Sequence, residues 1–102
     1  TPHRSPLGLV FVSDTKLPTY WQGTDKSLSA FILSWGAAGG TFSDKGQDLL
    51  HMQLTKVNDN YEAKVDQIAR GFQNPIDSVL IDNRLYVLEY GGNGTIWEIT
   101  FK

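Results

Sequence analysis

One strand-turn-strand pattern occurs twice in this chain, and this repeat constrains the fold more than any other feature. A shift of 55 positions places Phe31 on Tyr86 and Gly36 on Gly91, with apolar residues matched between them. Each copy begins with an apolar run that has a proline at its second position, over residues 5–12 and 74–81, and this run leads into residues 31–36 and 86–91. Repeated units of this size cannot bury their own hydrophobic faces and pack against neighbouring units. The repeat therefore predicts a piece of something larger, or a chain that assembles.

Seven β-strands are predicted from short or alternating apolar runs, and no helix is predicted. Asp82 and Asn83 form a two-residue hairpin loop, because both residue types tolerate positive φ. The weakest assignment is the segment 62–69, where helix-forming residues alternate imperfectly between apolar and polar. The predicted strands cover residues 6–12, 30–36, 48–55, 62–69, 76–81, 84–91 and 95–101.

The order of these strands predicts an all-β fold of antiparallel four-stranded meanders. Four strands precede about residue 70 and three follow it, and a β-propeller blade has four strands. We therefore expect one partial propeller domain over residues 1–102, about two blades of a six-bladed propeller. The first blade would span about 5–70, and an incomplete second blade about 71–102.

Composition argues against several classes of partner. The net charge is −2 and acids and bases are interspersed, so no basic stripe is available to neutralise a nucleic-acid backbone. The chain has no cysteine, which excludes disulfides and thiolate metal sites. No apolar run approaches the roughly 20 residues of a membrane span. We expect neither a nucleic-acid nor a membrane partner.

Several sequence blocks resemble the C-terminal stretch of the glucose/sorbosone dehydrogenase family, over nearly the whole chain. They are His3–Phe11, Leu17–Pro18, Tyr20–Gly23, Ala30–Ile32, Ser34–Gly36, Asn74–Asp77, Leu85–Leu88 and Gly94–Trp97. The resemblance implies a six-bladed β-propeller that oxidises aldose or sorbosone-type sugars with pyrroloquinoline quinone (PQQ), often with calcium. It also implies an extracellular or periplasmic protein several times longer. This chain would then be a fragment that is not itself catalytic.

One departure from the family's pattern leaves a second function open. Quinone-binding members carry arginines just before the aspartate that corresponds to Asp77, and here residues 74–76 are the uncharged Asn-Pro-Ile. Because PQQ carries three carboxylates, holding it requires several cationic or N–H donors. We therefore expect no PQQ binding by this chain alone. The alternative is a non-enzymatic propeller module that binds carbohydrate or protein.

The candidate site residues lie in loops that a propeller would gather at one end of its central channel. His3 is the candidate catalytic base, because a neutral imidazole with a pKa near 6.5 can take a proton from a sugar hydroxyl. Arg4 would pair with a cofactor carboxylate or a sugar hydroxyl. Trp35 and Tyr90, at equivalent positions of the repeat, would stack on a sugar or planar cofactor, and Asn74 completes the predicted cofactor-binding set. The alternatives are a flexible terminal histidine, a solvated arginine and aromatic packing between blades. No metal ligand is predicted.

His51, in the middle of a predicted strand, is expected to be a packing or surface residue. No serine or cysteine stands at a spacing from a histidine that is typical of nucleophilic catalysis.

Two partial blades would leave apolar faces and a strand edge uncovered. We expect these faces to be covered by the remaining blades of a propeller or by identical chains, three of which would total six blades. The apolar residues expected on them are Leu9, Phe11, Leu33, Val79, Leu88 and Ile96.

Overall fold

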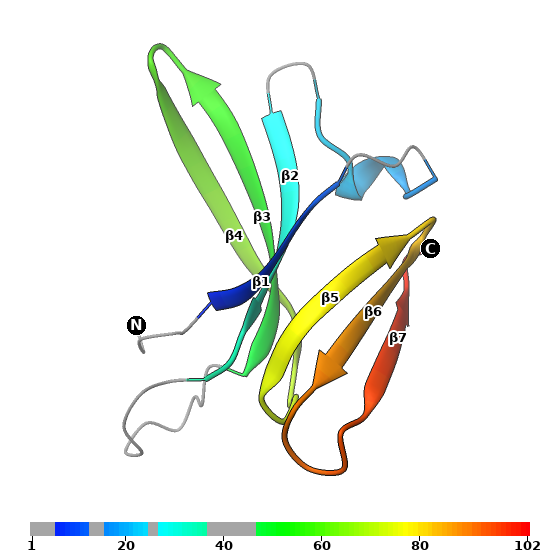
Figure 1. Ribbon diagram of the computed structural model, residues 1–102. Helices are drawn as coiled ribbons and strands as arrows, with labels where there is room; N and C mark the ends of the chain where they lie inside the picture. Colours follow the sequence, from blue (N-terminus) through cyan, green and yellow to red (C-terminus); the bar gives the residue numbers. More distant parts are fainter. Residues whose placement is uncertain (1–5, 13–15, 25–26, 37–46) are drawn as a thin grey trace.

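The computed structural model contains two antiparallel β-sheets and describes residues 6–12, 16–24, 27–36 and 47–102. The first sheet has the strand order β1-β2-β3-β4 and the second β5-β6-β7, so both are meanders (Figure 1). A single 3₁₀ turn, η1, lies between β1 and β2. The elements are β1 (Pro6–Phe11), η1 (Thr19–Trp21), β2 (Ser27–Ser34), β3 (Asp48–Val57), β4 (Asn60–Arg70), β5 (Pro75–Ile81), β6 (Arg84–Glu89) and β7 (Ile96–Thr100).

The seven strands lie where the apolar patterns predicted them, which confirms the all-β assignment. The uncertain segment 62–69 is part of β4, which pairs with β3 through a tight turn where Asn58 has a φ of 56°. Asp82 has a φ of 55° in the β5–β6 hairpin, as its residue type predicted. The main difference in bounds is that β2 begins at Ser27, three residues before the predicted start. None of the described residues forms a helix long and apolar enough to cross a membrane.

The hydrogen-bonding register repeats between the two sheets. A β-bulge follows Pro6 where β1 pairs with β2, and an equivalent bulge follows Pro75 where β5 pairs with β6. Just beyond the bulge, Gly8 pairs with Leu33 in the first sheet, and Asp77 pairs with Leu88 in the second. Apolar patterns alone do not specify a bulge, which is a local feature of strand pairing. The repeat therefore extends from the sequence to the details of strand pairing.

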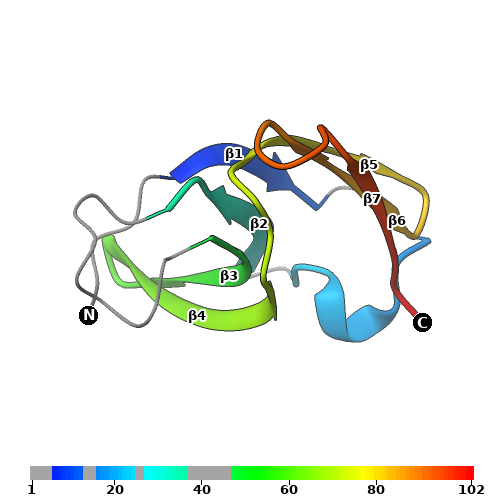
Figure 2. The same ribbon diagram turned by 90° about the horizontal axis from the view of Figure 1, so that it is seen from below.

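The two sheets pack against each other with β1 beside β5 (Figures 1 and 2). The two strands approach closely at Gly8, where a Cβ would lie in van der Waals contact with the Cα of Asp77, at 3.4 Å. Further from this contact, η1 lies between the first sheet and the end of β7 (Figure 2). There Trp21 packs against Phe101, with ring centroids 5.1 Å apart.

A single apolar core fills the space between the sheets. Phe31 of β2 stacks on Phe101, which follows β7, with ring centroids 4.9 Å apart. Both inward faces contribute residues that are almost completely buried, so burial of apolar surface holds the sheets together. The core residues are Leu17, Phe31, Leu33, Leu49, Phe72, Leu85, Val87 and Phe101.

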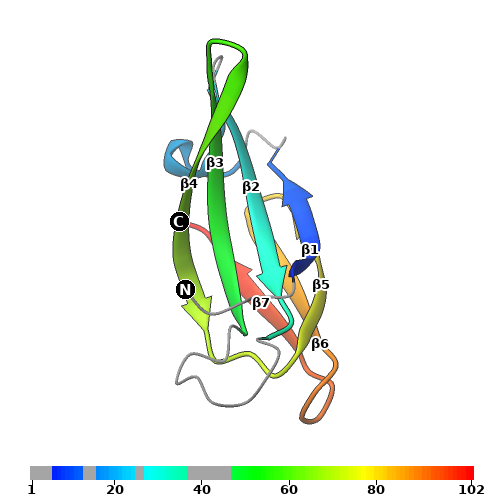
Figure 3. The same ribbon diagram turned by 90° about the vertical axis from the view of Figure 1, so that its left-hand side faces the viewer.

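The outward face of each sheet is apolar and exposed. Leu33 was expected on such a face, and this prediction is wrong, because Leu33 is completely buried. Leu33 pairs with Gly8 on one side and Leu49 on the other, and this row of paired residues faces the second sheet. Figure 3 shows the outward face of the first sheet, which no described segment covers. The five other predicted residues are exposed, namely Leu9, Phe11, Val79, Leu88 and Ile96.

Candidate functional site

Two aromatic residues predicted from the repeat meet at one end of the two sheets. Trp35 directly follows β2, and Tyr90 directly follows β6. Their ring centroids are 5.8 Å apart and their planes are inclined by 37°. Trp35 is half-buried, whereas Tyr90 is 72% exposed. Each sheet thus contributes one ring to a pair that keeps an aromatic surface open to solvent.

Asn74 connects the two aromatic residues. Its backbone carbonyl accepts a hydrogen bond from the N–H of Tyr90 at 2.9 Å, and its Nδ2 donates to the carbonyl of Trp35 at 3.4 Å. Its φ is 52°, in the left-handed region that asparagine tolerates better than most residues. Its N–H donates to Oε1 of Gln47 at 3.4 Å. Three of the five predicted site residues therefore lie together.

The backbone beneath this pair is held by a buried carboxylate and a tight turn. Glu89 is 6% exposed, and its Oε2 accepts a hydrogen bond from the N–H of Gln73 at 2.5 Å. The N–H of Gly91 donates to the carbonyl of Gln73 at 3.0 Å. A Cβ at Gly91 would lie 2.7 Å from Oδ1 of Asn74, so this position has no space for a larger residue. We call Trp35, Asn74 and Tyr90, with this supporting backbone, the aromatic end.

The described residues of the aromatic end do not suit an anionic ligand. Gln47, Gln73 and Asn74 are neutral, and the nearby buried Glu89 is acidic. PQQ would bring three carboxylates, which need cationic or N–H donors from several directions. Among the described residues, those that hydrogen-bond to Trp35 or Tyr90 include no lysine or arginine. This part of the site therefore does not fit PQQ, and it fits a neutral polar ligand better.

Two predicted site residues, His3 and Arg4, lie outside the described residues, so the proposed base and cation have no position here. Within the described ranges, no three histidine, cysteine, aspartate or glutamate side chains gather in a way that could hold a metal ion.

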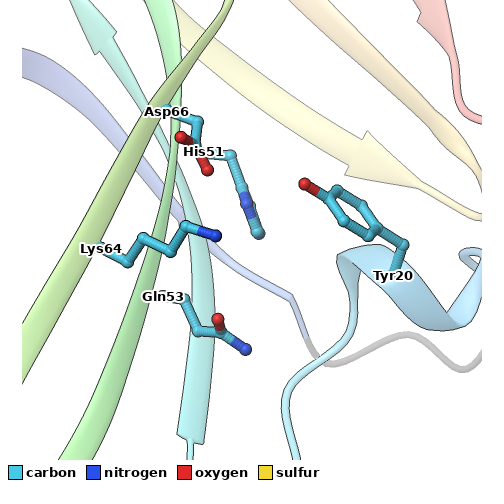
Figure 4. A pocket seen from close by; sticks show the side chains of 5 residues that line it. All are labelled: Tyr20, His51, Gln53, Lys64 and Asp66. Atoms are coloured by element: carbon cyan, nitrogen blue, oxygen red, sulfur yellow. The ribbon is translucent and has the colours of Figure 1, made fainter.

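A second polar cluster surrounds a pocket of about 240 Å³ at the rim of the first sheet (Figure 4). His51 and Gln53 lie on β3, and they pair across the strands with Asp66 and Lys64 of β4. Tyr20 of η1 completes the lining, and Figure 4 shows its hydroxyl directed toward His51.

Ser29 lies against His51, with 2.7 Å between Oγ and Nε2. This pair was not predicted, because no serine stands at a typical spacing from a histidine in the sequence. The two residues are 22 positions apart, and only the register of β2 on β3 brings them together. A Ser–His contact raises the question of an activated nucleophile.

The direction of the hydrogen bonds answers this question. Oγ of Ser29 is also 2.7 Å from the carbonyl oxygen of Trp21, which can only accept. A hydroxyl has a single proton, so Ser29 donates to Trp21 and must accept from the Nε2–H of His51. In this tautomer His51 cannot take the proton from Ser29. The pair is therefore a structural contact and not a nucleophile with its base.

The surroundings of His51 agree with a packing role. The residue is 6% exposed, and the ring centroids of Trp21 and Phe31 are 5.0 Å and 5.4 Å from its own. Burial lowers the pKa of His51 from its ordinary value, although Asp66 raises it, and Lys64 lowers it further. The neutral imidazole is therefore favoured. His51 was predicted to be either a packing or a surface residue, and its burial makes it a packing residue.

Comparisons with protein-family models, with curated proteins and with solved structures find no match for this chain.

Proposed function

We propose that this chain is part of a β-propeller and that its aromatic end binds carbohydrate. The observation that carries the proposal is the pairing of Trp35 with Tyr90 across the two sheets. The two rings occupy the same position in successive repeats, so the stacking of the sheets brings them to the same end. A loop-borne pair of this kind, on a rigid β scaffold, is a common way to build a binding site.

The chemistry of the aromatic end favours a neutral sugar. A pyranose presents an apolar C–H face, which the open face of Tyr90 can cover, and a rim of hydroxyls, which a nearby amide such as that of Asn74 can bind. The buried carboxylate of Glu89 disfavours acidic ligands by charge repulsion. Because Tyr90 is 72% exposed, little of the ligand would be enclosed. We therefore expect weak binding, with a Kd on the order of 1 mM.

Three features support the propeller architecture. The first sheet is a four-stranded meander, as each blade of a propeller is. The same bulge recurs in the second sheet, which indicates a structural repeat. Both outward faces are apolar, as expected of blades whose neighbours are missing. The second sheet has three strands within the described residues, so β7 would be an edge where a fourth strand can pair.

A second candidate function is aldose oxidation by a longer, extracellular or periplasmic protein that contains this chain. The resemblance to glucose/sorbosone dehydrogenases supports it, and several of the matching blocks overlap β1, β2, β5 and β6. In such a protein His3 would act as the base and Arg4 as a cation. PQQ would there supply the hydride-accepting chemistry. Its binding would need cationic groups that the described part of the aromatic end lacks.

Titration with an aldose, followed by NMR of the tryptophan indole N–H groups, tests carbohydrate binding. The chain has three tryptophans, and only Trp35 belongs to the aromatic end, so its signal should move alone. We expect saturable shifts of the Trp35 signal up to about 100 mM D-glucose or a related aldose. Tyr90→Ala should weaken binding at least about tenfold, which corresponds to ~1.4 kcal/mol.

Tyr20→Ala is the matched control, because Tyr20 is a similarly exposed tyrosine at 69% but lies on η1. It should leave the titration unchanged. The proposal is wrong if no tested aldose shifts the Trp35 signal, or if the shift survives in Tyr90→Ala.

A further inference from the structure

The interface between the two sheets shows how an additional sheet could pack on either side of the molecule. Within the chain, the inward face of the first sheet packs on the inward face of the second. The first face contributes Phe31, Leu33 and Leu49, and the second contributes Leu85, Val87 and Phe101. All are nearly or completely buried by this contact.

The outward face of the second sheet is equivalent to the inward face of the first. Leu88 pairs with Ile96 across β6 and β7. This pair is equivalent in the repeat to Leu33 and Leu49, which pair across β2 and β3. Tyr86 similarly takes the place of Phe31. The exposed apolar residues of this face are Val79 (52%), Ile81 (54%), Leu88 (39%) and Ile96 (65%).

The outward face of the first sheet is equivalent to the inward face of the second. The pair Ile32–Leu50 takes the place of Val87–Trp97, and the pair Ala30–Met52 takes the place of Leu85–Ile99. This face is apolar over all four strands. Its most exposed apolar residues are Leu7 (55%), Leu9 (55%), Phe11 (51%), Leu28 (51%), Tyr61 (57%) and Val65 (49%).

The two outward faces therefore match each other in the way that the two inward faces do. Three charged residues of the outward β5–β7 face distinguish it chemically from the inward β1–β4 face. Arg84 and Glu98 take the places of Ser29 and His51, and they form an ion pair at 3.8 Å. Asp77 takes the place of Gly8, where β1 approaches β5. Its carboxylate turns back on its own strand and accepts a hydrogen bond from the N–H of Ser78 at 2.8 Å. One of its two carboxylate oxygens is therefore already hydrogen-bonded at the face where another sheet would pack.

We propose that a second copy of this chain places the outward face of its β1–β4 sheet on the outward face of the β5–β7 sheet of the first. The contact repeats the sheet packing inside the chain and is head-to-tail, because the two faces are different. Each added copy buries one of its two faces, so an open assembly always exposes one face of each kind at its ends and association continues until a ring closes. Three copies would contribute six sheets. The inference depends on the repeat and the exposed faces and not on sugar binding.

Light scattering coupled to size-exclusion chromatography tests this inference on the 102-residue chain. We expect the mass to rise with concentration from that of the 11.4 kDa chain toward three times this value, about 34 kDa. Two lysine substitutions each disable one face: Leu9→Lys on the first sheet and Val79→Lys on the second. Both residues are about half exposed, and far-UV circular dichroism would verify that the variants keep their β structure.

Mixing the two variants separates head-to-tail packing from other modes. Each variant alone should remain a monomer. In an equal mixture, the intact second-sheet face of Leu9→Lys can pack on the intact first-sheet face of Val79→Lys. We expect a heterodimer of twice 11.4 kDa, about 23 kDa, that grows no further because both remaining faces carry a lysine. Asn60→Lys, at the exposed start of β4, is the control and should associate as the unaltered chain does.

Three results would overturn the inference. One is an unaltered chain that stays monomeric at about 200 µM, where even a weak contact should be populated. Another is a single-face variant that still associates like the unaltered chain, since this would indicate a contact between two identical faces. The third is a mixture of folded variants that forms no heterodimer.

Discussion

Truncation of Leu85 should destabilise the protein far more than truncation of Leu88, three residues further along the same strand. Leu85 is completely buried between the sheets, whereas Leu88 faces outward and is 39% exposed. A buried leucine replaced by alanine loses its transfer free energy and leaves a cavity, which together cost about 2–5 kcal/mol. At Leu88 solvent can fill the space, and the loss is the transfer term for a partly buried side chain, about 1 kcal/mol or less.

The difference is large compared with the ~5–15 kcal/mol that stabilise a domain. It can be measured by urea denaturation of Leu85→Ala, Leu88→Ala and the unaltered chain, followed by circular dichroism at about 1 µM to limit self-association. With an m-value of about 1–3 kcal/mol/M, a difference of at least about 1 kcal/mol should place the midpoint for Leu85→Ala at least ~0.3 M below that of Leu88→Ala. Equal midpoints, or a lower one for Leu88→Ala, would show that the core is not between the faces assigned to it.

Three further results are expected. Folding lowers the pKa of His51, so below about pH 6.5 His51 is protonated more readily in the unfolded chain than in the folded one. The contribution of neutral His51 to the free energy of unfolding is therefore present above about pH 6.5 and is lost as the pH falls below it. His51→Gln, which keeps a donor for Ser29, should reduce the drop in urea midpoint between about pH 7.5 and 5.5, and an unchanged drop would contradict this reasoning. Gly91→Ala should displace Asn74 and abolish the sugar-induced shift of Trp35, because its Cβ would lie 2.7 Å from Oδ1 of Asn74; retained binding would refute this. Titration of the chain with PQQ should show no saturable site, and a micromolar complex would revive quinone binding.

The strands could be predicted from the sequence because their signals are local. Period-two patterns and turn residues such as Asp82 lie within a few positions of one another, and the backbone follows them directly. The segment 62–69 also forms a strand, since β3 pairs with it along most of its length, with an irregularity at Ile68. The 3₁₀ turn at Thr19–Trp21 was not predicted, because a single turn has no periodicity to detect.

The direction in which a side chain faces was harder to predict. Leu33 was expected outward and is buried, because the bulge after Pro6 and the register of β2 decide which row of residues faces the second sheet. A shift of one residue in register exchanges the two faces of a strand. The contact of Ser29 with His51 is another product of register, over 22 positions, and no local spacing indicates it.

The aromatic end was predictable in part. The equivalence of Trp35 and Tyr90 in the repeat brought both into the predicted site, and the structure places them 5.8 Å apart. Asn74 was included because it stands in the loop that enters β5, and its positive φ and its bonds to both aromatic residues explain its position. The acidic support from Glu89 was missed, because in the sequence it is an ordinary polar residue at the end of a strand.

The packing of the two sheets as successive repeats is the central claim, since both the aromatic end and the proposed self-association depend on it. The most direct measurement is a NOESY spectrum of the isotope-labelled chain, recorded in the Val79→Lys variant to exclude contacts between copies. We expect cross-peaks between the ring protons of Phe31 and Phe101, whose centroids are 4.9 Å apart, together with cross-peaks between Gly8 and Asp77. A folded variant that shows the contacts within each sheet but none between Phe31 and Phe101 or between Gly8 and Asp77 would contradict this claim.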